Sequence, residues 1–556
     1  MSHATANGQR NRTTIYSATL ASCVMLAGSA HAAFQISTDP THDVSCSDGT
    51  CTATAKNAIL NTTDLAGMLE NSDVKLASGA GAVTIGFISP FSWVSAHRLT
   101  VDADANVAFR APVTIAGPGG LTIITNNAGA GGDLFFYDGG YADFWDLSSS
   151  LIINGTSFVL VDTLTALKDA ANNNPSGNYA LTKSYDAFKN KIFHATLIPT
   201  FSGTLEGLGH DISNLSINAS QNARKKGRAR VTLLAMFGSS TGTLRDIGLL
   251  NTSISGGDYH TAALVGENDG TIISARTSGT VTGTYYAGGL TSLNRGTVAW
   301  SHSDSAVSAE YAGGAVGYNI GTISESYATG PITTHSNYTS KLGGLVGIND
   351  KPTGVVSQSY ATSTVSNGSE MGGLIGENNG VVTLSHSEGQ VSTFSNQEAG
   401  GLIGANTGTV SQSFATGASS MAGLVGGNAG TITQCYATGA VTGYGYVGGL
   451  VGTTPYNGII TQSYSTGSVQ DNSNTGGSIG YDGGSKISSV YWDTDTSGIT
   501  NLSRGAGNIP YDPGIEGLTS DELKGKLPRG FDKTVWAKKA SINGGFPYLR
   551  ANPPPQ

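Results

Sequence analysis

Acidic side chains are spread through the middle of the chain, where an enzyme that cleaves polysaccharides would need them clustered with Lys or Arg. Glu267 and Glu377 share one position of a repeated motif, directly before an Asn, but lie four repeats apart. With coils stacked about 4.8 Å apart, their separation is about 19 Å, too far for paired acid–base work. The remaining acids of this region are scattered through the repeats: Asp269, Asp304, Glu310, Glu325, Asp350, Glu370, Glu388 and Glu398. We therefore expect no enzyme.

Two short strings match motifs that carry chemistry in other proteins. The string from Gly238 to Gly242 fits Gly-x-Ser-x-Gly, but its setting is a repeat turn rather than a strand–elbow–helix. The string from Asp493 to Gly498 begins like a calcium-binding EF-hand loop, but Arg504 stands where a bidentate Glu is required. We expect no catalytic residue, no metal site and no cofactor, with a weak calcium site at the second string as the alternative.

A short basic run is the one segment whose charge suggests a ligand. Five cations lie within seven residues of an otherwise acidic chain, and such a run forms an anion-binding loop in many proteins. Polyanionic glycans or lipopolysaccharide phosphates would fit it. The alternative is a solvated, protease-sensitive loop, and the sequence favours this alternative. The residues are Arg224, Lys225, Lys226, Arg228 and Arg230.

These candidates are positioned by a repeat that fills residues 262–490. The repeat reads Gly-Gly-Leu-Val-Gly-x-Asn-x-Gly-Thr-Ile-x-x-Ser-Tyr-Ala-Thr-Gly-x-Val, and its copies lie 22 to 30 residues apart. Each copy holds short apolar runs flanked by Thr, Ser and Val and separated by Gly or Asn, which is typical of strands and turns. A unit of this length fits one coil of a β-solenoid and is too short for a propeller blade. We predict an all-β fold, a right-handed parallel β-helix with a small helical insertion and a C-terminal cap.

Stacked coils place equivalent residues in columns along the solenoid axis. One column consists of Asn residues, whose amides can bond to one another from coil to coil: Asn268, Asn294, Asn319, Asn349, Asn378, Asn406 and Asn428. A second column is mostly aromatic and forms either a sugar-binding stripe or a packing ladder of stacked rings. Its recurrence in nearly every coil favours packing. The column contains Arg276, His302, Tyr327, Tyr360, His386, Phe414, Tyr436, Tyr464 and Tyr491.

The repeat closely resembles the GLUG motif, as in Gly344-Leu345-Val346-Gly347. GLUG repeats occur in secreted and surface proteins of bacteria, including filamentous-haemagglutinin-like adhesins and some immunoglobulin A protease precursors. The segment before the repeats is similar to the same adhesins at 92–103, 177–181 and 201–210. The resemblance implies a β-helix that serves cell adhesion. The chain contains no His-Glu-x-x-His motif, so the zinc protease activity of the protease precursors is not expected.

Composition agrees with an exported solenoid. Only 12% of residues are charged, about half the usual share, and the 79 Gly residues are about twice the usual share. The net charge of −9 argues against a general nucleic-acid binder. No segment is long and apolar enough to predict a transmembrane helix.

The first 32 residues have the features of a secretory signal. Arg10 and Arg12 precede a short apolar run, and cleavage between Ala32 and Ala33 fits the small-x-small rule. The alternative is a lipoprotein site at Cys23, which the polar residues before it disfavour. Cys46 and Cys51 flank a turn-like segment, and export predicts a disulfide between them.

The chain therefore divides into five parts: a signal peptide at 1–32, an N-terminal cap with irregular coils at 33–160, a helical insertion at 161–200, GLUG-type coils at 201–490 and a C-terminal cap at 491–556. The insertion is expected to pack on the side of the solenoid, with the wall of a binding cleft as the alternative. The cap is expected to cover the last coil, because an open β-edge invites aggregation.

We expect a secreted or surface-exposed adhesin-like solenoid whose partners are surface glycans or matrix proteins. The alternatives are a polysaccharide-active β-helix enzyme, a lyase or glycoside hydrolase, and a spacer that binds nothing. The signal accounts for passage across the inner membrane only, so a periplasmic location stays open. The oligomeric state, the ligand and the route across the outer membrane are not encoded in any motif.

Overall fold

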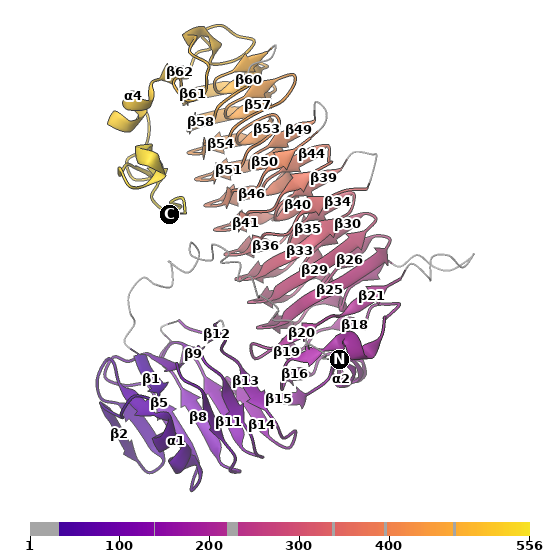
Figure 1. The fold of residues 1–556 in the computed structure, drawn as a ribbon, viewed down its shortest axis with the longest axis vertical. Helices are drawn as coiled ribbons and strands as arrows, with labels where there is room; N and C mark the ends of the chain where they lie inside the picture. The colour runs from indigo at the N-terminus through magenta and orange to yellow at the C-terminus, as the bar shows by residue number, and fades with distance from the viewer. Residues whose placement is uncertain are drawn as a thin grey trace, which may run out of the picture.

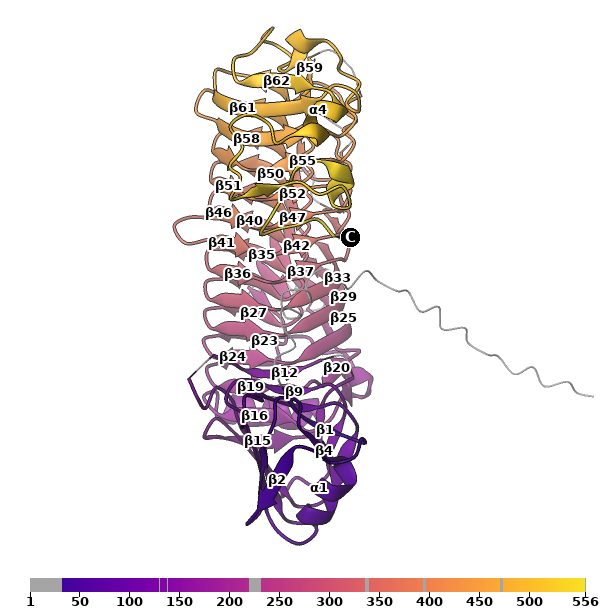
Figure 2. The same cartoon turned by 90° about the vertical axis from the view of Figure 1, so that its left-hand side faces the viewer.

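The computed structural model describes residues 33–555, apart from 130, 138, 220–231, 336–339, 394–396 and 471–473. The chain forms a parallel β-solenoid with few helices, which confirms the predicted fold class. Figure 1 shows two solenoid segments, a shorter one at the lower left and a longer one that rises to the top of the molecule. Figure 2 shows the same stack from its side, with the strands of successive coils lying above one another.

The first segment consists of residues 33–154 and has three sheets, whose strands pair in parallel except for the antiparallel pair of β2 (Val44–Ser47) and β3 (Thr50–Ala53). Its strands alternate buried and half-exposed side chains, as the period of two requires. One sheet contains β4 (Ile59–Asn61), β1 (Ala33–Ser37), β6 (Thr84–Phe87), β9 (Val107–Phe109) and β12 (Leu134–Phe136). The second contains β7 (Phe91–Trp93), β10 (Val113–Ile115) and β13 (Ala142–Phe144). The third contains β2, β3, β5 (Val74–Ala77), β8 (Arg98–Asp102), β11 (Gly120–Ile124) and β14 (Ser150–Ile153).

A two-residue hairpin joins the segments. Asn154 and Gly155 have φ of 47° and 79°, the left-handed values of a type I′ turn. The turn pairs β14 antiparallel to β15 (Thr156–Val161), whereas the coils on either side pair in parallel. The reversal ends the first stack and starts the second, so the coils of residues 33–154 form a stack of their own.

Arg245 fixes the angle between the two segments. Its guanidinium lies 2.9 Å from Asp246 and 3.2 Å from Glu206 in the second segment, and 3.1 Å from Asp133 in the first. The backbone contributes as well, because the amide of Ala142 in β13 donates to the carbonyl of Leu208. Arg245 and Asp133 are 112 residues apart, so no local sequence pattern predicts their contact.

One coil of the second segment shows how the repeat folds. Its strands are β34 (Tyr311–Gly313), β35 (Val316–Asn319), β36 (Thr322–Ser324), β37 (Tyr327–Ala328) and β38 (Ile332–Thr333). Each pairs in register with the same motif position of the next coil, as Gly313 does with Gly343 and Asn319 with Asn349. The inward Ile, Leu, Val and Ala side chains form one continuous core along the stack.

Two sheets of this segment carry the surface described below. The seven-stranded sheet contains β22 (Leu233–Leu234), β26 (His260–Ala262), β30 (Tyr286–Gly288), β34, β39 (Lys341–Gly343), β44 (Glu370–Gly372) and β49 (Glu398–Gly400). The eleven-stranded sheet contains β18 (Ile198–Phe201), β23 (Phe237–Ser240), β27 (Val265–Asn268), β31 (Thr291–Asn294), β35, β40 (Val346–Asn349), β45 (Ile375–Asn378), β50 (Ile403–Asn406), β53 (Val425–Asn428), β57 (Val451–Thr454) and β60 (Ile479–Asp482).

The Gly-Gly pair of the repeat lies where the chain turns between these two sheets. A Cβ atom on Gly314 would lie 2.2 Å from the carbonyl oxygen of Gly344 in the next coil. No side chain fits at that distance, so the second Gly of the motif is required by close stacking rather than by its backbone angles.

The Asn column forms an uninterrupted chain of hydrogen bonds. The Nδ2 of each Asn donates to the Oδ1 of the Asn in the next coil at 2.8 Å, from Asn268 through Asn428. All seven side chains are buried. A buried amide satisfies both its donor and its acceptor only if the neighbouring coils hold Asn in the same register, so the column fixes the register of the stack.

The helical part of the insertion is shorter than predicted, and it covers a different part of the solenoid. Within 161–200 only α2 (Leu164–Asn173) and the short η1 (Ala187–Asn190) are helical, and β16 (Asn178–Leu181) is a solenoid strand paired with β15 and with β19 (Thr204–Glu206). The α2 side chains Leu164 and Leu167 join the core of the second segment. The helix contacts β18, the first strand of the eleven-stranded sheet, so it covers the start of the stack rather than its side.

Helix caps follow local sequence signals. Thr163 caps α2 by accepting from the amide of Ala166. Near the N-terminus, Asn61 caps α1 (Thr62–Leu69) by accepting from the amide of Thr63. A capping box of Thr519 and Glu522 begins α4 (Ser520–Gly525).

The C-terminal cap also differs from its prediction. The coils continue past residue 490 through β61 (Lys486–Asp493) to β62 (Ile515–Leu518), the last strand of the stack. Residues 519–555 then turn back and lie along the side of the coils, as Figure 2 shows for the yellow segment in front of the stack. Asn552 reaches the carbonyls of Ser385 and Gln412, several coils below the end. There the segment covers aromatic side chains that would otherwise be exposed to solvent.

We predict that Asn319→Ala destabilises the solenoid by about 1–3 kcal/mol, because it leaves a buried donor and a buried acceptor on the neighbouring Asn residues without a partner. The denaturant midpoint of the far-UV circular dichroism signal measures this change. Asn457→Ala, at an exposed turn, is the matched control. Equal midpoints for the two variants would show that the column contributes nothing to stability.

Candidate functional site: an exposed tyrosine face

The aromatic column predicted from the repeat forms a stack of parallel rings. Neighbouring ring centroids lie 4.6 to 5.3 Å apart from His302 to Tyr464, and neighbouring ring planes differ by 1° to 9°. Each ring face is covered by the next ring, so no face in the stack remains for a sugar. This geometry agrees with the packing interpretation. We call this column the aromatic ladder.

The upper half of the aromatic ladder is also covered from the side by residues 519–555. Trp536 lies 6.1 Å from Tyr436 and 5.8 Å from Tyr464, measured between ring centroids. The hydroxyl of Tyr464 donates to the carbonyl of Pro547 at 2.5 Å. These side chains, with Phe531, form a buried cluster of their own.

A different set of aromatic side chains lies at the surface, where two of them are exposed and three are half-buried. Their rings project from the seven-stranded sheet, from the turns before it and from the neighbouring eleven-stranded sheet. We call them, with His260, the tyrosine face: Tyr259, Tyr285, Tyr286, Tyr311 and Tyr318. Tyr259 and Tyr285 are 47% and 40% exposed. The strands β26, β30 and β34 lie along the right-hand edge in Figure 1, and α4 lies on the left.

Strand register builds this face. His260 pairs with Tyr286, and Tyr286 pairs with Tyr311, so one row of rings rises along the axis. Tyr259 and Tyr285 precede the first two members and form a second row, with ring centroids 5.6 Å apart. Tyr318 reaches across from the other sheet and meets Tyr286 edge-to-face at 5.5 Å. Side chains from three coils thus form one contiguous aromatic surface.

Tyr311 and Tyr318 are neutral hydrogen-bonding groups of the face. Burial, reinforced by a hydrogen bond to Glu310, raises the pKa of Tyr311 to about 12. Burial and the hydrogen bond to Asp350 raise the pKa of Tyr318, whose hydroxyl lies 2.5 Å from that carboxylate. Burial opposes the ionisation of Asp350, but the hydrogen bonds from Tyr318, the Lys351 amide and Asn379 outweigh it and lower the pKa of Asp350. The carboxylate therefore remains charged beside the rings.

Charged side chains continue the same row beyond Tyr311. In register with it follow Lys341, Glu370 and Glu398 on successive coils. Lys341 is 3.6 Å from Glu370 and also contacts Glu377 on β45. Burial raises the pKa values of Glu370 and Glu398, and the nearby Glu370 charge raises that of Glu398 further. Acids that are dispersed in the sequence thus meet on one surface, which corrects the expectation that they stay scattered.

A shallow hollow of about 400 Å³ lies at the turns that follow the eleven-stranded sheet. Its floor is made by the short turns at Asn379, Thr407 and Gly430, and its ends by Lys351 and Asn457. Asn379 donates to Asp350 at 3.1 Å, so the hollow adjoins the tyrosine face through that carboxylate. The hollow is open and polar, and no aromatic ring lines it.

The structure places the other predicted sites as follows. Cys46 and Cys51 form a disulfide between β2 and β3. The buried Cys435 has its pKa raised to about 12 by burial, which leaves its thiol unreactive. The cleavage position at Ala32 and the basic run Arg224, Lys225, Lys226, Arg228 and Arg230 lie outside the described residues. Signal cleavage and anion binding therefore remain predictions.

The two motif-like strings have structural roles. Ser240 of the Gly-x-Ser-x-Gly string is buried in β23, a strand rather than the predicted turn. Asp493 accepts from the amides of Asp495 and Thr496 and from the hydroxyl of Ser520, which anchors the start of α4. Within the described ranges no group of three or more His, Cys, Asp or Glu side chains could hold a metal ion. Nor does any helix in those ranges have the length and hydropathy to span a bilayer.

The tyrosine face was missed by the sequence analysis, although a signal exists. His260, Tyr286 and Tyr311 occupy the same position of three consecutive repeats, two residues before the Gly-Gly pair or its equivalent. Later repeats place Lys341, Glu370 and Glu398 there. A position that is aromatic in some coils and charged in others is an outward position, because a packing position keeps one kind of side chain.

Comparisons with known proteins place the chain only coarsely. No protein-family model matches it. Halomucin from Haloquadratum walsbyi is 31% identical over 245 residues, which is 42% of this chain and 2% of halomucin. This chain therefore spans a very small part of that relative's length.

Two solved structures are similar at low identity. A Bacteroides ovatus protein provisionally assigned as an immunoglobulin A1 protease is 14% identical, with a TM-score of 0.27 over 71% of this chain and 93% of the other. A structure described as IgA1 protease is 16% identical, with a TM-score of 0.29 over 62% of this chain and 23% of the other. At these TM-scores the alignments carry no argument, and the fold rests on the strand pairing itself.

We predict that His386→Phe makes the protein less sensitive to acid. Burial in the aromatic ladder lowers the pKa of His386 to about 4, whereas an unfolded His has a pKa near 6.5. Between these values the unfolded chain binds the proton and the folded chain does not, so folding stability falls as pH falls from about 6.5 to 4. Removing the imidazole removes up to roughly 3 kcal/mol of this loss.

Thermal unfolding at pH 7 and at pH 4.5 measures the effect, with exposed His42→Phe as the control. Some acid sensitivity should remain, because burial lowers the pKa of His210 to about 4 as well. A pH dependence identical to that of the wild type would contradict the burial of a neutral His386.

Proposed function

We propose that this chain is a secreted or surface-displayed β-solenoid that acts as an adhesin-like protein and contacts cell-surface glycans or matrix proteins. The observation that carries the proposal is the exposed tyrosine face. Tyr side chains combine a large rigid contact area with a polar tip and lose little conformational entropy on binding. Contiguous exposed apolar surfaces often mark interaction sites.

Other features support this proposal. The repeat resembles the GLUG motif of bacterial surface proteins, and the predicted signal at 1–32 would export the chain. The stacked coils form a long body, and the tyrosine face lies on its side, where a large partner can reach it (Figure 1). A periplasmic location is the alternative to surface display. The net charge of −9 disfavours nucleic acid as the partner.

A polysaccharide-active enzyme is the second candidate. The observation that favours it is the row of Lys341, Glu370 and Glu398 directly beside the tyrosine face. A carboxyl whose pKa is raised, as that of Glu398 is, suits a general acid. Reducing-end release from polysaccharides, measured for the wild type and for Glu398→Gln, separates the two functions. An adhesin gives no turnover in either protein, whereas an enzyme gives turnover that the substitution abolishes.

The adhesin proposal predicts saturable binding of the purified chain to at least one class of ligand on an array of glycans and matrix proteins. Tyr259→Ala combined with Tyr285→Ala should weaken that binding at least tenfold, because it removes the two most exposed rings of the face. Replacing the five cations of 224–230 by Gln tests the basic run separately. A folded chain that binds none of the ligands would contradict the proposal and favour a spacer.

A further inference from the structure

The orientation of the rings distinguishes the tyrosine face from the aromatic ladder. In the ladder the planes of neighbouring rings differ by less than 10°, so each ring covers the next. Between tyrosines of the face the planes differ by 33° to 75°. Tilted rings leave part of each face uncovered, and Tyr259 and Tyr285 keep 47% and 40% of their surface exposed. The faces of these rings are open to a ligand.

The spacing of the rings follows the solenoid. Ring centroids lie 5.6 Å apart from Tyr259 to Tyr285 and 5.1 Å apart from Tyr286 to Tyr311, along the direction in which coils stack. Coil spacing is set by the strand separation of about 4.8 Å. A pyranose ring in an extended polysaccharide advances by a similar length. A chain of sugars that lies along the axis can therefore place one C–H face on each coil's ring.

Charge around the face selects among polysaccharides. Glu310 bonds to Tyr311, and the charged Asp350 bonds to Tyr318. Among the described residues, Arg295 and Lys341 flank the face, and both are paired with acids. Arg295 lies 3.4 Å from Glu267 and 3.3 Å from Asp269, and Lys341 contacts Glu370 and Glu377.

The surface therefore presents negative charge and hydroxyls to a ligand. A sulfated, sialylated or uronate-bearing glycan would be repelled, whereas the hydroxyls of an uncharged sugar can donate to the carboxylates.

We propose that the tyrosine face binds an uncharged polysaccharide, which lies along the solenoid axis across Tyr259, Tyr285 and Tyr311. This inference rests on the proposed function and names its ligand class. It differs from the expectation drawn from the basic run at 224–230, which would favour polyanionic glycans.

The test is isothermal titration of the purified chain with two groups of hexasaccharides. The uncharged group contains cello-, malto-, manno- and xylo-hexaose, and the anionic group contains hexagalacturonate and a heparin hexasaccharide. We expect at least one uncharged probe to bind and the anionic probes to bind at least tenfold more weakly. Tyr285→Ala should weaken the uncharged probe at least fivefold, the range expected for losing one stacking ring. Tyr456→Ala is the matched control, because Tyr456 is 78% exposed at a turn away from the face.

Charge reversal tests the selectivity independently of stacking. Glu310→Lys should reduce the preference for uncharged over anionic probes at least threefold, and far-UV circular dichroism verifies that the variant folds. An unchanged preference would overturn the role given to the acidic side chains.

The outcomes separate this inference from the proposed function. If only anionic probes bind, or if Tyr285→Ala leaves the uncharged probe unaffected, the inference is wrong while adhesion remains. If no hexasaccharide binds but a matrix protein on the array does, the face has another partner and the inference is again wrong. If neither array nor titration detects a ligand, both proposals fail.

Discussion

The amide of each motif Asn can bond to the coil above and to the coil below only if every coil presents Asn at the same height and angle. The six consecutive 2.8 Å hydrogen bonds from Asn268 to Asn428 show that this condition is met without a break. A slip of one residue would bury unpaired amides in an apolar core, at a cost of several kcal/mol for each coil. The register of all other columns follows from this one.

Because the coils stack in register, each position of the sequence repeat forms a row of side chains along the solenoid axis. A position that keeps its residue type through the repeats becomes a packing column, as the aromatic ladder and the Gly-Gly pair do. A position that changes type becomes a face whose chemistry varies along the axis. The row that begins with His260, Tyr286 and Tyr311 continues as Lys341, Glu370 and Glu398, so one row is aromatic at one end and charged at the other. Recognition can therefore be local although the fold is repetitive.

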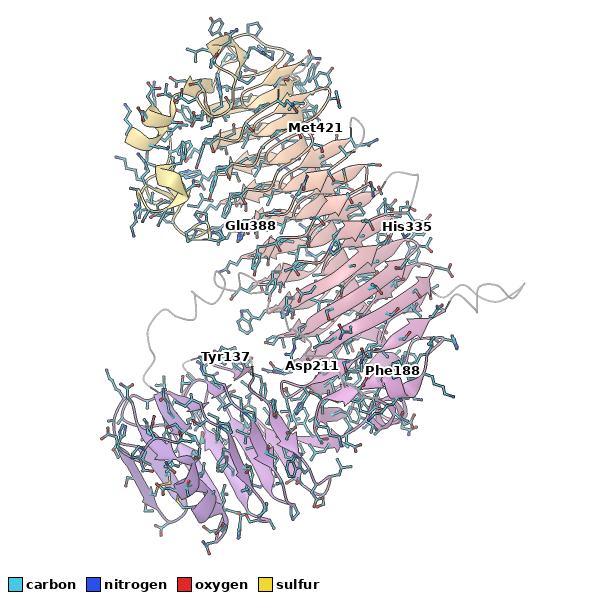
Figure 3. The ribbon with its side chains drawn as sticks, viewed as in Figure 1. Tyr137, Phe188, Asp211, His335, Glu388 and Met421 are labelled. Atoms are coloured by element: carbon cyan, nitrogen blue, oxygen red, sulfur yellow. A yellow bond between two sulfur atoms is a disulfide. The ribbon has the colours of Figure 1, made fainter. Side chains whose placement is uncertain are left out.

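Near both ends of the second segment, another part of the chain covers apolar side chains and shields them from solvent. At the start of the second segment α2 covers the core with Leu164 and Leu167. Near the other end residues 519–555 lie against the aromatic ladder rather than over the last coil. In Figure 3, Glu388 lies on the ladder side of the stack, which is the side of the C-terminal segment. Met421 and His335 lie on the opposite side. The upper half of the ladder is thus covered, whereas Tyr259 and Tyr285 of the tyrosine face stay exposed.

Much of the fold could be predicted because local sequence patterns determine it. The solenoid follows from the repeat, the Asn column from one motif position, and the caps at Thr163 and Thr519 from their side chains. The break between the segments was missed although Asn154-Gly155 is a strong hairpin signal, because the strand pattern on both sides looked continuous. The contacts of Arg245 and the path of residues 519–555 depend on pairings between distant residues, which no local pattern encodes.

The candidate site was harder to predict than the fold. A search for positions that are aromatic in most repeats selects the aromatic ladder, because a packing position recurs most regularly. The tyrosine face combines two rows and three coils, and it includes Tyr318 from a second sheet. Its members come together through the pairing of β26, β30 and β34 and through the turn between β34 and β35. Its ligand class depends on Glu310 and Asp350, whose proximity to the rings becomes visible only in three dimensions.

The central claim is that the tyrosine face, and not the aromatic ladder, is the surface that meets a ligand. Hydroxyl-radical footprinting with mass spectrometry, in the presence and absence of an uncharged polysaccharide, tests it residue by residue. The account predicts protection of Tyr259 and Tyr285, with no change at Tyr456 or Tyr511. Protection confined to residues of the ladder side, such as Trp300 and Tyr327, would contradict it.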